Sequence, residues 1–110
     1  MGFQCMRISW NHDLEKIVRI FLDEIRKLYR VDSAYLFGSH AKGTPDRWSD
    51  IDLAVVSPDF SEDLFEERLI LMHMASEIDD RIEPKPFRPD NFNPIDPLVH
   101  EIQKHGVKLI

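Results

Sequence analysis

Short apolar segments alternate with longer amphipathic ones along this chain, and the alternation limits the folds that it can adopt. Residues 34–37 and 50–56 are short and largely apolar, and Gly or Pro follows each of them, which is typical of buried strands. Residues 11–30 and 61–80 instead carry apolar residues every three or four positions, which is typical of helices. The side chains of segment 61–80 that we expect to be buried are Leu64, Phe65, Leu69, Met72, Ala75 and Ile78.

The remaining segments continue the alternation of helix and strand. We expect a brief helical stretch, an edge strand, a helix and a last strand at residues 40–42, 81–86, 94–105 and 107–110. Pro84 and Pro86 have no N–H to donate, so their strand belongs at a sheet edge. Gly106 is placed to cap the preceding helix. The order predicts an α/β (α+β) domain with helices packed on a small mixed sheet.

Length and charge restrict the class of protein. The chain has 110 residues, which predicts a single domain over 1–110, with residues 1–10 as a loosely ordered tail. The formal net charge of −6 argues against general nucleic-acid binding, which depends on neutralising phosphates. No apolar run is long enough to cross a membrane, and the single cysteine permits no internal disulfide. These features predict a cytoplasmic protein.

Asp50 and Asp52 lie two positions apart at the start of a predicted strand. Alternate residues of a strand share a face, so these carboxylates should lie side by side. Two such charges repel by roughly 2–3 kcal/mol at about 6 Å in an effective dielectric of about 20. A divalent cation reverses the sign of that interaction, and oxygen ligands suit Mg²⁺. The alternative is a pair of solvated acids at the start of an edge strand.

Gly38 and Ser39 end one predicted strand and open a short helix. Glycine allows a ligand to approach the backbone closely, and the free N–H groups of a helix start attract phosphate. The alternative is an ordinary turn in which Ser39 caps the helix. Ten residues separate Ser39 from Asp50. If the two strands are neighbours, a phosphate turn and a metal-binding pair meet at one site, as triphosphate chemistry requires.

Here the chain resembles a known family. The segments 36–43 and 49–55 together look like the signature of the minimal nucleotidyltransferases, which belong to the DNA polymerase beta-like superfamily. That signature is Gly-Ser, ten residues, then Asp-x-Asp. The resemblance implies that Asp50 and Asp52 bind two Mg²⁺ ions, while Gly38 and Ser39 hold the triphosphate. An acceptor hydroxyl then attacks the α-phosphorus, and pyrophosphate leaves.

The same resemblance implies a third metal-binding carboxylate on a later strand. Glu83 is the candidate, and Asp79 and Asp80 are its competitors a few residues earlier. Glu83 could instead pair with a neighbouring basic side chain. The family often has Asp at this place, and an arginine often follows its Gly-Ser, where this chain has His40.

Lys42 and Arg47 are the basic residues within the motif loop. Either one could contact a nucleotide phosphate. The alternative is that both are solvated loop charges.

Small members of this family resemble the antitoxin half of HEPN/MNT toxin–antitoxin pairs. The resemblance implies AMP transfer from ATP to a tyrosine of a HEPN toxin, and therefore a nucleoside triphosphate and a HEPN protein as partners, in a homo- or hetero-oligomer. Two alternatives remain: a binding module that neutralises a HEPN partner without catalysis, and a transferase of the aminoglycoside type that modifies a small molecule.

Overall fold

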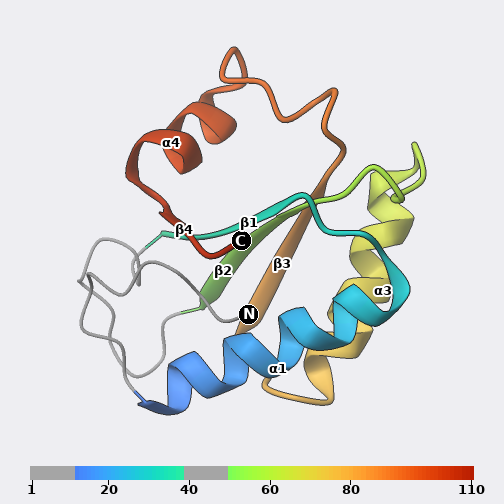
Figure 1. The fold of residues 1–110 in the computed structure, drawn as a ribbon, viewed down its shortest axis with the longest axis vertical. Helices are drawn as coiled ribbons and strands as arrows, with labels where there is room; N and C mark the ends of the chain where they lie inside the picture. Colours follow the sequence, from blue (N-terminus) through green and yellow to red (C-terminus); the bar gives the residue numbers. More distant parts are fainter. Residues whose placement is uncertain (1–11, 39–49) are drawn as a thin grey trace.

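The computed structural model describes residues 12–38 and 50–110, which form helices on both faces of a four-stranded mixed sheet (Figure 1). The helices are α1 (His12–Leu28), α3 (Leu64–Ser76) and α4 (Pro97–His105), and the strands are β1 (Ser33–Phe37), β2 (Ile51–Val56), β3 (Ile82–Phe87) and β4 (Val107–Lys108). The predicted α/β class and order of these elements are confirmed. The expected stretch 40–42 and the tail 1–10 lie outside the described residues.

Helix α1 is amphipathic, as its sequence predicts. Its buried residues, at intervals of one turn, are Leu14, Val18, Phe21, Leu22 and Ile25. Acidic residues occupy its first turn and basic residues its last, which matches the direction of the helix dipole.

No helix in residues 12–38 and 50–110 has the length and apolar composition needed to span a membrane.

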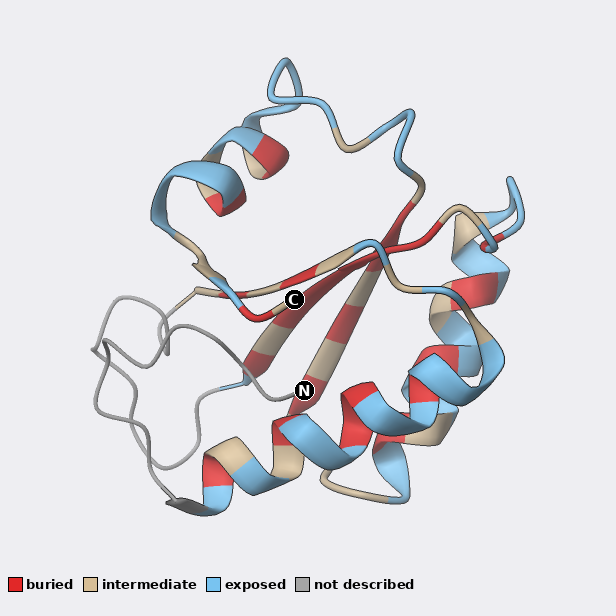
Figure 2. Ribbon diagram, viewed as in Figure 1, coloured by how far each residue is buried: buried red, intermediate tan, exposed pale blue. Residues whose placement is uncertain are grey.

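The sheet has the order β3-β2-β1-β4, with β2 antiparallel to β1 and parallel to β3. Helices α1 and α3 cover one face and α4 covers the other, so β2 is buried along most of its length (Figure 2). The α1/α3 face packs around Leu36, Leu53 and Val55. The α4 face packs Ala54 and Val56 against α4. This double covering explains the nearly continuous apolar sequence of β2.

Strand β3 lies at an edge, as its prolines predict. The carbonyl oxygens of Arg81 and Phe87 accept hydrogen bonds from Ile51 and Ser57, at 2.7 and 3.0 Å. Odd-numbered residues therefore direct their backbone polar groups toward β2. Pro84 and Pro86 direct their nitrogens to the free edge, where no ladder hydrogen bond is lost.

Helix α3 is shorter than the expected 61–80 at both ends. Its N-cap is Asp63, whose carboxylate accepts a hydrogen bond from the Glu66 N–H at 3.0 Å. After Ser76 the chain turns, and the Asp79 carboxylate accepts a hydrogen bond from the Arg81 N–H at 2.9 Å. Such local side-chain bonds compete with continuation of the helix.

The buried face of α3 also differs from the expectation. Phe65, Leu69 and Met72 are exposed, with 71% of Phe65 accessible to solvent. Leu71 and Glu67, which were not expected inside, are buried in their place. Leu64, Ala75 and Ile78 lie against the core as predicted. The apolar residues of this helix are distributed around its whole circumference, so their spacing alone could not identify the buried face.

Helix α4 begins at Pro97 rather than at residue 94. The Asp96 side chain accepts a hydrogen bond from the Leu98 N–H at 2.8 Å, and proline suits the first helical position. Gly106 is the C-cap, as expected, but its φ is −74°. Glycine is needed there for space, because a Cβ would collide with the Ile102 carbonyl oxygen. Only residues 107–108 of the expected last strand pair with β1.

Candidate nucleotide and metal site

Gly38 and Asp52 meet where β1 ends and β2 begins. Phe37 pairs with Asp52 in the antiparallel ladder, which brings the next residue, Gly38, beside the same carboxylate. Gly38 has a φ of 76°, in the left-handed region that L side chains rarely adopt. A Cβ at this position would overlap Oδ2 of Asp52 and lie 3.3 Å from its Cγ. The backbone conformation therefore requires glycine, and a side chain at this position would displace the Asp52 carboxylate.

Asp50 and Asp52 frame the start of β2. Asp50 is exposed just before the strand, and Asp52 is half-buried within it. Ile51 and Leu53 are fully buried in the core under α1 and α3. Because strand residues alternate between faces, Asp52 belongs to the opposite, α4 face.

Glu83 lies directly across from Asp52 in the register of the parallel strands β2 and β3. Its neighbour Ile82 is buried in the core under α1 and α3, so Glu83 also belongs to the α4 face. The Glu83 Oε1 atom lies 3.3 Å from Nη2 of Arg68, a residue of α3. The basic partner is thus distant in sequence, and not one of the strand neighbours considered as the alternative.

The two competing acids have other environments. Asp79 accepts two hydrogen bonds of 3.1 Å from the Arg81 guanidinium. Its side-chain hydrogen bond to Arg81 holds the pKa of Asp79 below its usual value. Asp80 is exposed in the turn that precedes β3. Neither residue lies in register with Asp52, as Glu83 does.

These carboxylates have the chemistry that Mg²⁺ requires. Asp50, Asp52 and Glu83 supply hard oxygen donors from the start of β2 and from the adjacent strand β3, and the missing Cβ of Gly38 lets the Asp52 carboxylate lie against the turn that follows β1. Within the part of the chain that is described, no three His, Cys, Asp or Glu side chains gather closely enough to hold a metal ion as they stand. Glu83 is engaged by Arg68 instead.

Several predicted site residues lie outside the described residues. These are Ser39, Lys42 and Arg47, together with His40. Their roles remain predictions. The structure does describe Gly38, which precedes these residues in the chain, and Asp50, which follows them.

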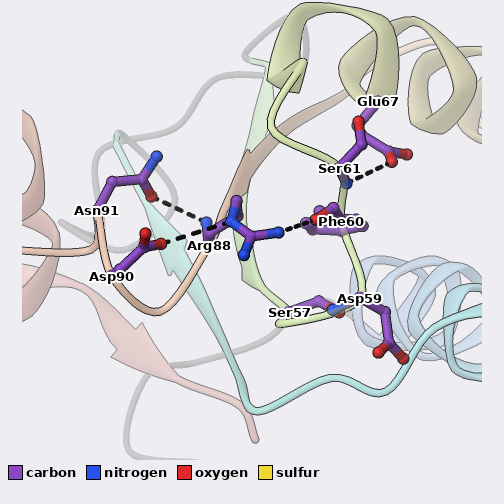
Figure 3. Close-up of polar contacts among 8 residues, drawn as sticks. All are labelled: Ser57, Asp59, Phe60, Ser61, Glu67, Arg88, Asp90 and Asn91. Atoms are coloured by element: carbon purple, nitrogen blue, oxygen red, sulfur yellow. Dashed lines mark hydrogen bonds and ion pairs between the residues drawn. The ribbon is translucent and has the colours of Figure 1, made fainter.

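A second polar cluster lies at the opposite end of β2, in the loop 57–63 (Figure 3). The Arg88 guanidinium donates a hydrogen bond to the Phe60 carbonyl oxygen, and Glu67 accepts one from the Ser61 N–H at 2.8 Å. The other Glu67 oxygen accepts a hydrogen bond from the Tyr29 hydroxyl at 2.9 Å. Burial, and then this bond, raise the pKa of Tyr29 to about 12. The cluster ties the loop to α1 and α3, so its evident role is structural.

Sequence reasoning missed Arg68 and Glu67. Each lies on a predicted helix, where a charged residue is normally expected to be solvated. Their partners are 15 residues away for Arg68 and 38 for Glu67. No local pattern indicates such contacts, because they depend on how α3 packs against β3 and α1.

Three kinds of similarity bear on the identity of the chain. The family model described as a nucleotidyltransferase domain matches residues 18–108. The protein adenylyltransferase MntA of Shewanella oneidensis is 37% identical over 68 residues, which cover 62% of this chain and 46% of MntA. The aligned segment therefore spans less than half of that relative.

Solved structures share the fold. A toxin–antitoxin complex with AMP-PNP contains a chain with a TM-score of 0.63 and 24% identity, covering 91% of this chain and 73% of that one. A mutant of the toxin–antitoxin MntA-HpeT gives a TM-score of 0.57 and 27% identity, covering 86% and 70%. The family match includes Gly38, Asp50, Asp52 and Glu83, and it extends over most of the sequence. The chain therefore belongs to the nucleotidyltransferase domain family.

Proposed function

We propose that this protein transfers AMP from ATP to a hydroxyl group of a partner protein, a tyrosine of a HEPN toxin, and thereby acts as an antitoxin. The observation that carries the proposal is the close approach of Gly38 to the Asp52 carboxylate, with Glu83 in register on the next strand. The similarity to the protein adenylyltransferase MntA favours AMP and a protein acceptor. Because less than half of MntA is aligned, its activity is carried over here as part of the proposal.

Each site residue has a role in this proposal. Asp50, Asp52 and Glu83 hold two Mg²⁺ ions, which supply neutralisation of the charge that develops on the phosphates. Gly38 and Ser39 hold the triphosphate through backbone N–H groups and a hydroxyl.

Lys42 and Arg47 add positive charge beside the phosphates. This contribution matters because the chain as a whole is acidic, with a net charge of −6. Local basic residues are then needed to attract a polyanion.

The reaction is an in-line displacement. The acceptor oxygen forms a bond to the α-phosphorus, and the bond from that phosphorus to the bridging oxygen breaks. Pyrophosphate leaves with the electron pair, and the hydroxyl proton is released to water. We place the reaction in the cytoplasm, where ATP and Mg²⁺ are available together.

A binding module without catalysis is the alternative from another class. It would neutralise the HEPN partner by contact and would need no carboxylates on the strands. A transferase that modifies small molecules is a further alternative. The two differ from our proposal in where a label from ATP goes: nowhere for the module, and to a free metabolite for the small-molecule enzyme.

The test is transfer from ATP labelled at the α-phosphate, with Mg²⁺ and the product of any adjacent gene that encodes a HEPN protein. We expect label on the HEPN protein, and none after its tyrosines are replaced by Phe. Asp52→Asn should abolish labelling, while Asp23→Asn, an exposed acid of α1, should retain it. Neutralisation of the toxin by unlabelled complex alone would favour the binding module.

A further inference from the structure

The ion pair between Arg68 and Glu83 crosses from one layer of the fold to the other. Arg68 belongs to α3, which packs on the face of the sheet that contains the buried Ile82. Glu83 alternates to the opposite face, where Asp52 is its partner in register. The guanidinium therefore extends from the α3 layer to a carboxylate of the edge strand β3 that alternates to the other face.

Arg68 is not optimally satisfied in this position. Its Nη2 atom lies 3.3 Å from Glu83 Oε1, but its Nε atom is buried and has no hydrogen-bond partner among the described residues. An unpartnered buried donor is unfavourable. The two side chains are also 38% and 36% exposed, so solvent screens their attraction. Little stability is lost when this pair separates.

We propose that Arg68 is a positioning residue that holds the Glu83 carboxylate in an ion pair and releases it when a divalent cation binds beside Asp52. The inference rests on the proposed metal-dependent transferase. In the metal-free protein, the guanidinium offsets the repulsion that Glu83 would add to Asp50 and Asp52. A bound cation takes over that role, and Glu83 can then turn inward as a ligand.

The test measures affinity for Mn²⁺ alone, by titrating the full chain and following free Mn²⁺ by electron paramagnetic resonance. Arg68→Gln removes the competitor of the cation, so Mn²⁺ should bind about three- to fivefold more tightly. Arg68→Lys keeps the charge and should restore the wild-type affinity. Lys27→Gln is the charge-matched control. It removes one positive side chain from an exposed ion pair with Glu24 on α1 and should leave the Mn²⁺ affinity unchanged. Thermal melting without metal confirms that each variant folds.

Glu83→Gln identifies the origin of the effect. When Arg68→Gln is added to Glu83→Gln, it should no longer tighten Mn²⁺ binding, because no carboxylate remains at position 83 to be released. An equal gain in both backgrounds would overturn the proposal in favour of a general charge effect. Weaker binding by Arg68→Gln would overturn it too, because Arg68 would then orient Glu83 toward the metal.

The proposed function fails in a different way. If wild type, Arg68→Gln and Glu83→Gln all bind no Mn²⁺, the metal site is absent, and both ideas fall. If wild type binds Mn²⁺, Glu83→Gln weakens that binding and Arg68→Gln leaves it unchanged, only the role of Arg68 is refuted.

Discussion

Gly38 lies so close to Asp52 that a Cβ at position 38 would overlap a carboxylate oxygen of that residue. The two residues are joined through the ladder, since Phe37 pairs with Asp52. The turn after β1 and the start of β2 are therefore one structural unit. A substitution at either Gly38 or Asp52 should therefore shift the position of the other residue.

Gly38→Ala should destabilise the protein and weaken ATP binding. The left-handed conformation at a φ of 76° costs alanine roughly 1–2 kcal/mol, and the collision with Asp52 adds to it. Calorimetry with ATP and Mg²⁺, beside urea unfolding, measures both effects. Gly106→Ala is the control, because the atoms nearest to its Cβ would be the carbonyl oxygens of Ile102 and Leu36 rather than the Asp52 carboxylate. It should lower stability while the folded variant retains ATP affinity.

Asp50→Asn and Asp52→Asn should each reduce AMP transfer by about a hundredfold or more, as expected when one preorganised charge is removed from a reaction centre. Asp50 is exposed and precedes the strand, so its replacement should leave the metal-free melting temperature equal or higher. A large drop in that temperature for Asp50→Asn would mean that the acid is structural.

Glu83→Gln should abolish transfer at saturating Mg²⁺, while Asp79→Asn and Asp80→Asn should retain it. Only Glu83 among the three lies in register with Asp52. Loss of transfer in an Asp variant, with normal rates for Glu83→Gln, would move the third metal ligand to the turn before β3.

Asp79→Asn should instead alter the pH dependence of stability. The hydrogen bond from Arg81 lowers the pKa of Asp79 below its usual 3.8 in the folded state. Its contribution is therefore complete above that value and is lost as pH falls through the lowered pKa. Unfolding measured as the pH is lowered should show a smaller acid-dependent loss in Asp79→Asn than in wild type.

Tyr29→Phe should lower stability by about 1–2 kcal/mol, because Glu67 loses a charge-assisted hydrogen bond. The pKa of Tyr29 rises from 10.0 to about 12 on folding. A raised pKa contributes stability that is complete below 10.0 and is lost as pH rises toward about 12. The stability gap between wild type and Tyr29→Phe should therefore narrow over this range in urea unfolding. Transfer should be unaffected, since the cluster lies beyond the far end of β2.

The sequence could predict the elements and the Gly38–Asp52 motif because both depend on short-range patterns. Alternation separates the face of β2 that contains Ile51 and Leu53 from the face that contains Asp52. The prolines identify β3 as an edge strand. The limits of α3 could not be predicted, because they depend on the side-chain cap of Asp63 and on the turn that begins after Ser76.

Side-chain contacts between different helices and strands could not be predicted from sequence patterns. Glu67 looks like a solvated helix charge until packing brings Tyr29 to it. The same holds for Arg68, whose partner Glu83 was expected to be a metal ligand, with a basic side chain of its own strand as the alternative partner. Helix periodicity was also ambiguous where Phe65 and Leu71 compete for the interior.

The prolines of β3 have a consequence for how copies of this protein can associate. An uncovered edge strand normally offers a row of N–H donors on which another chain can add a strand, and such growth leads to aggregation. Here Pro84 and Pro86 occupy the positions whose nitrogens point outward, so two donors are missing from a strand of six residues. Templated strand addition is thereby blocked at this rim of the sheet. Close association there would have to rely on side-chain surfaces, which are more selective than backbone pairing.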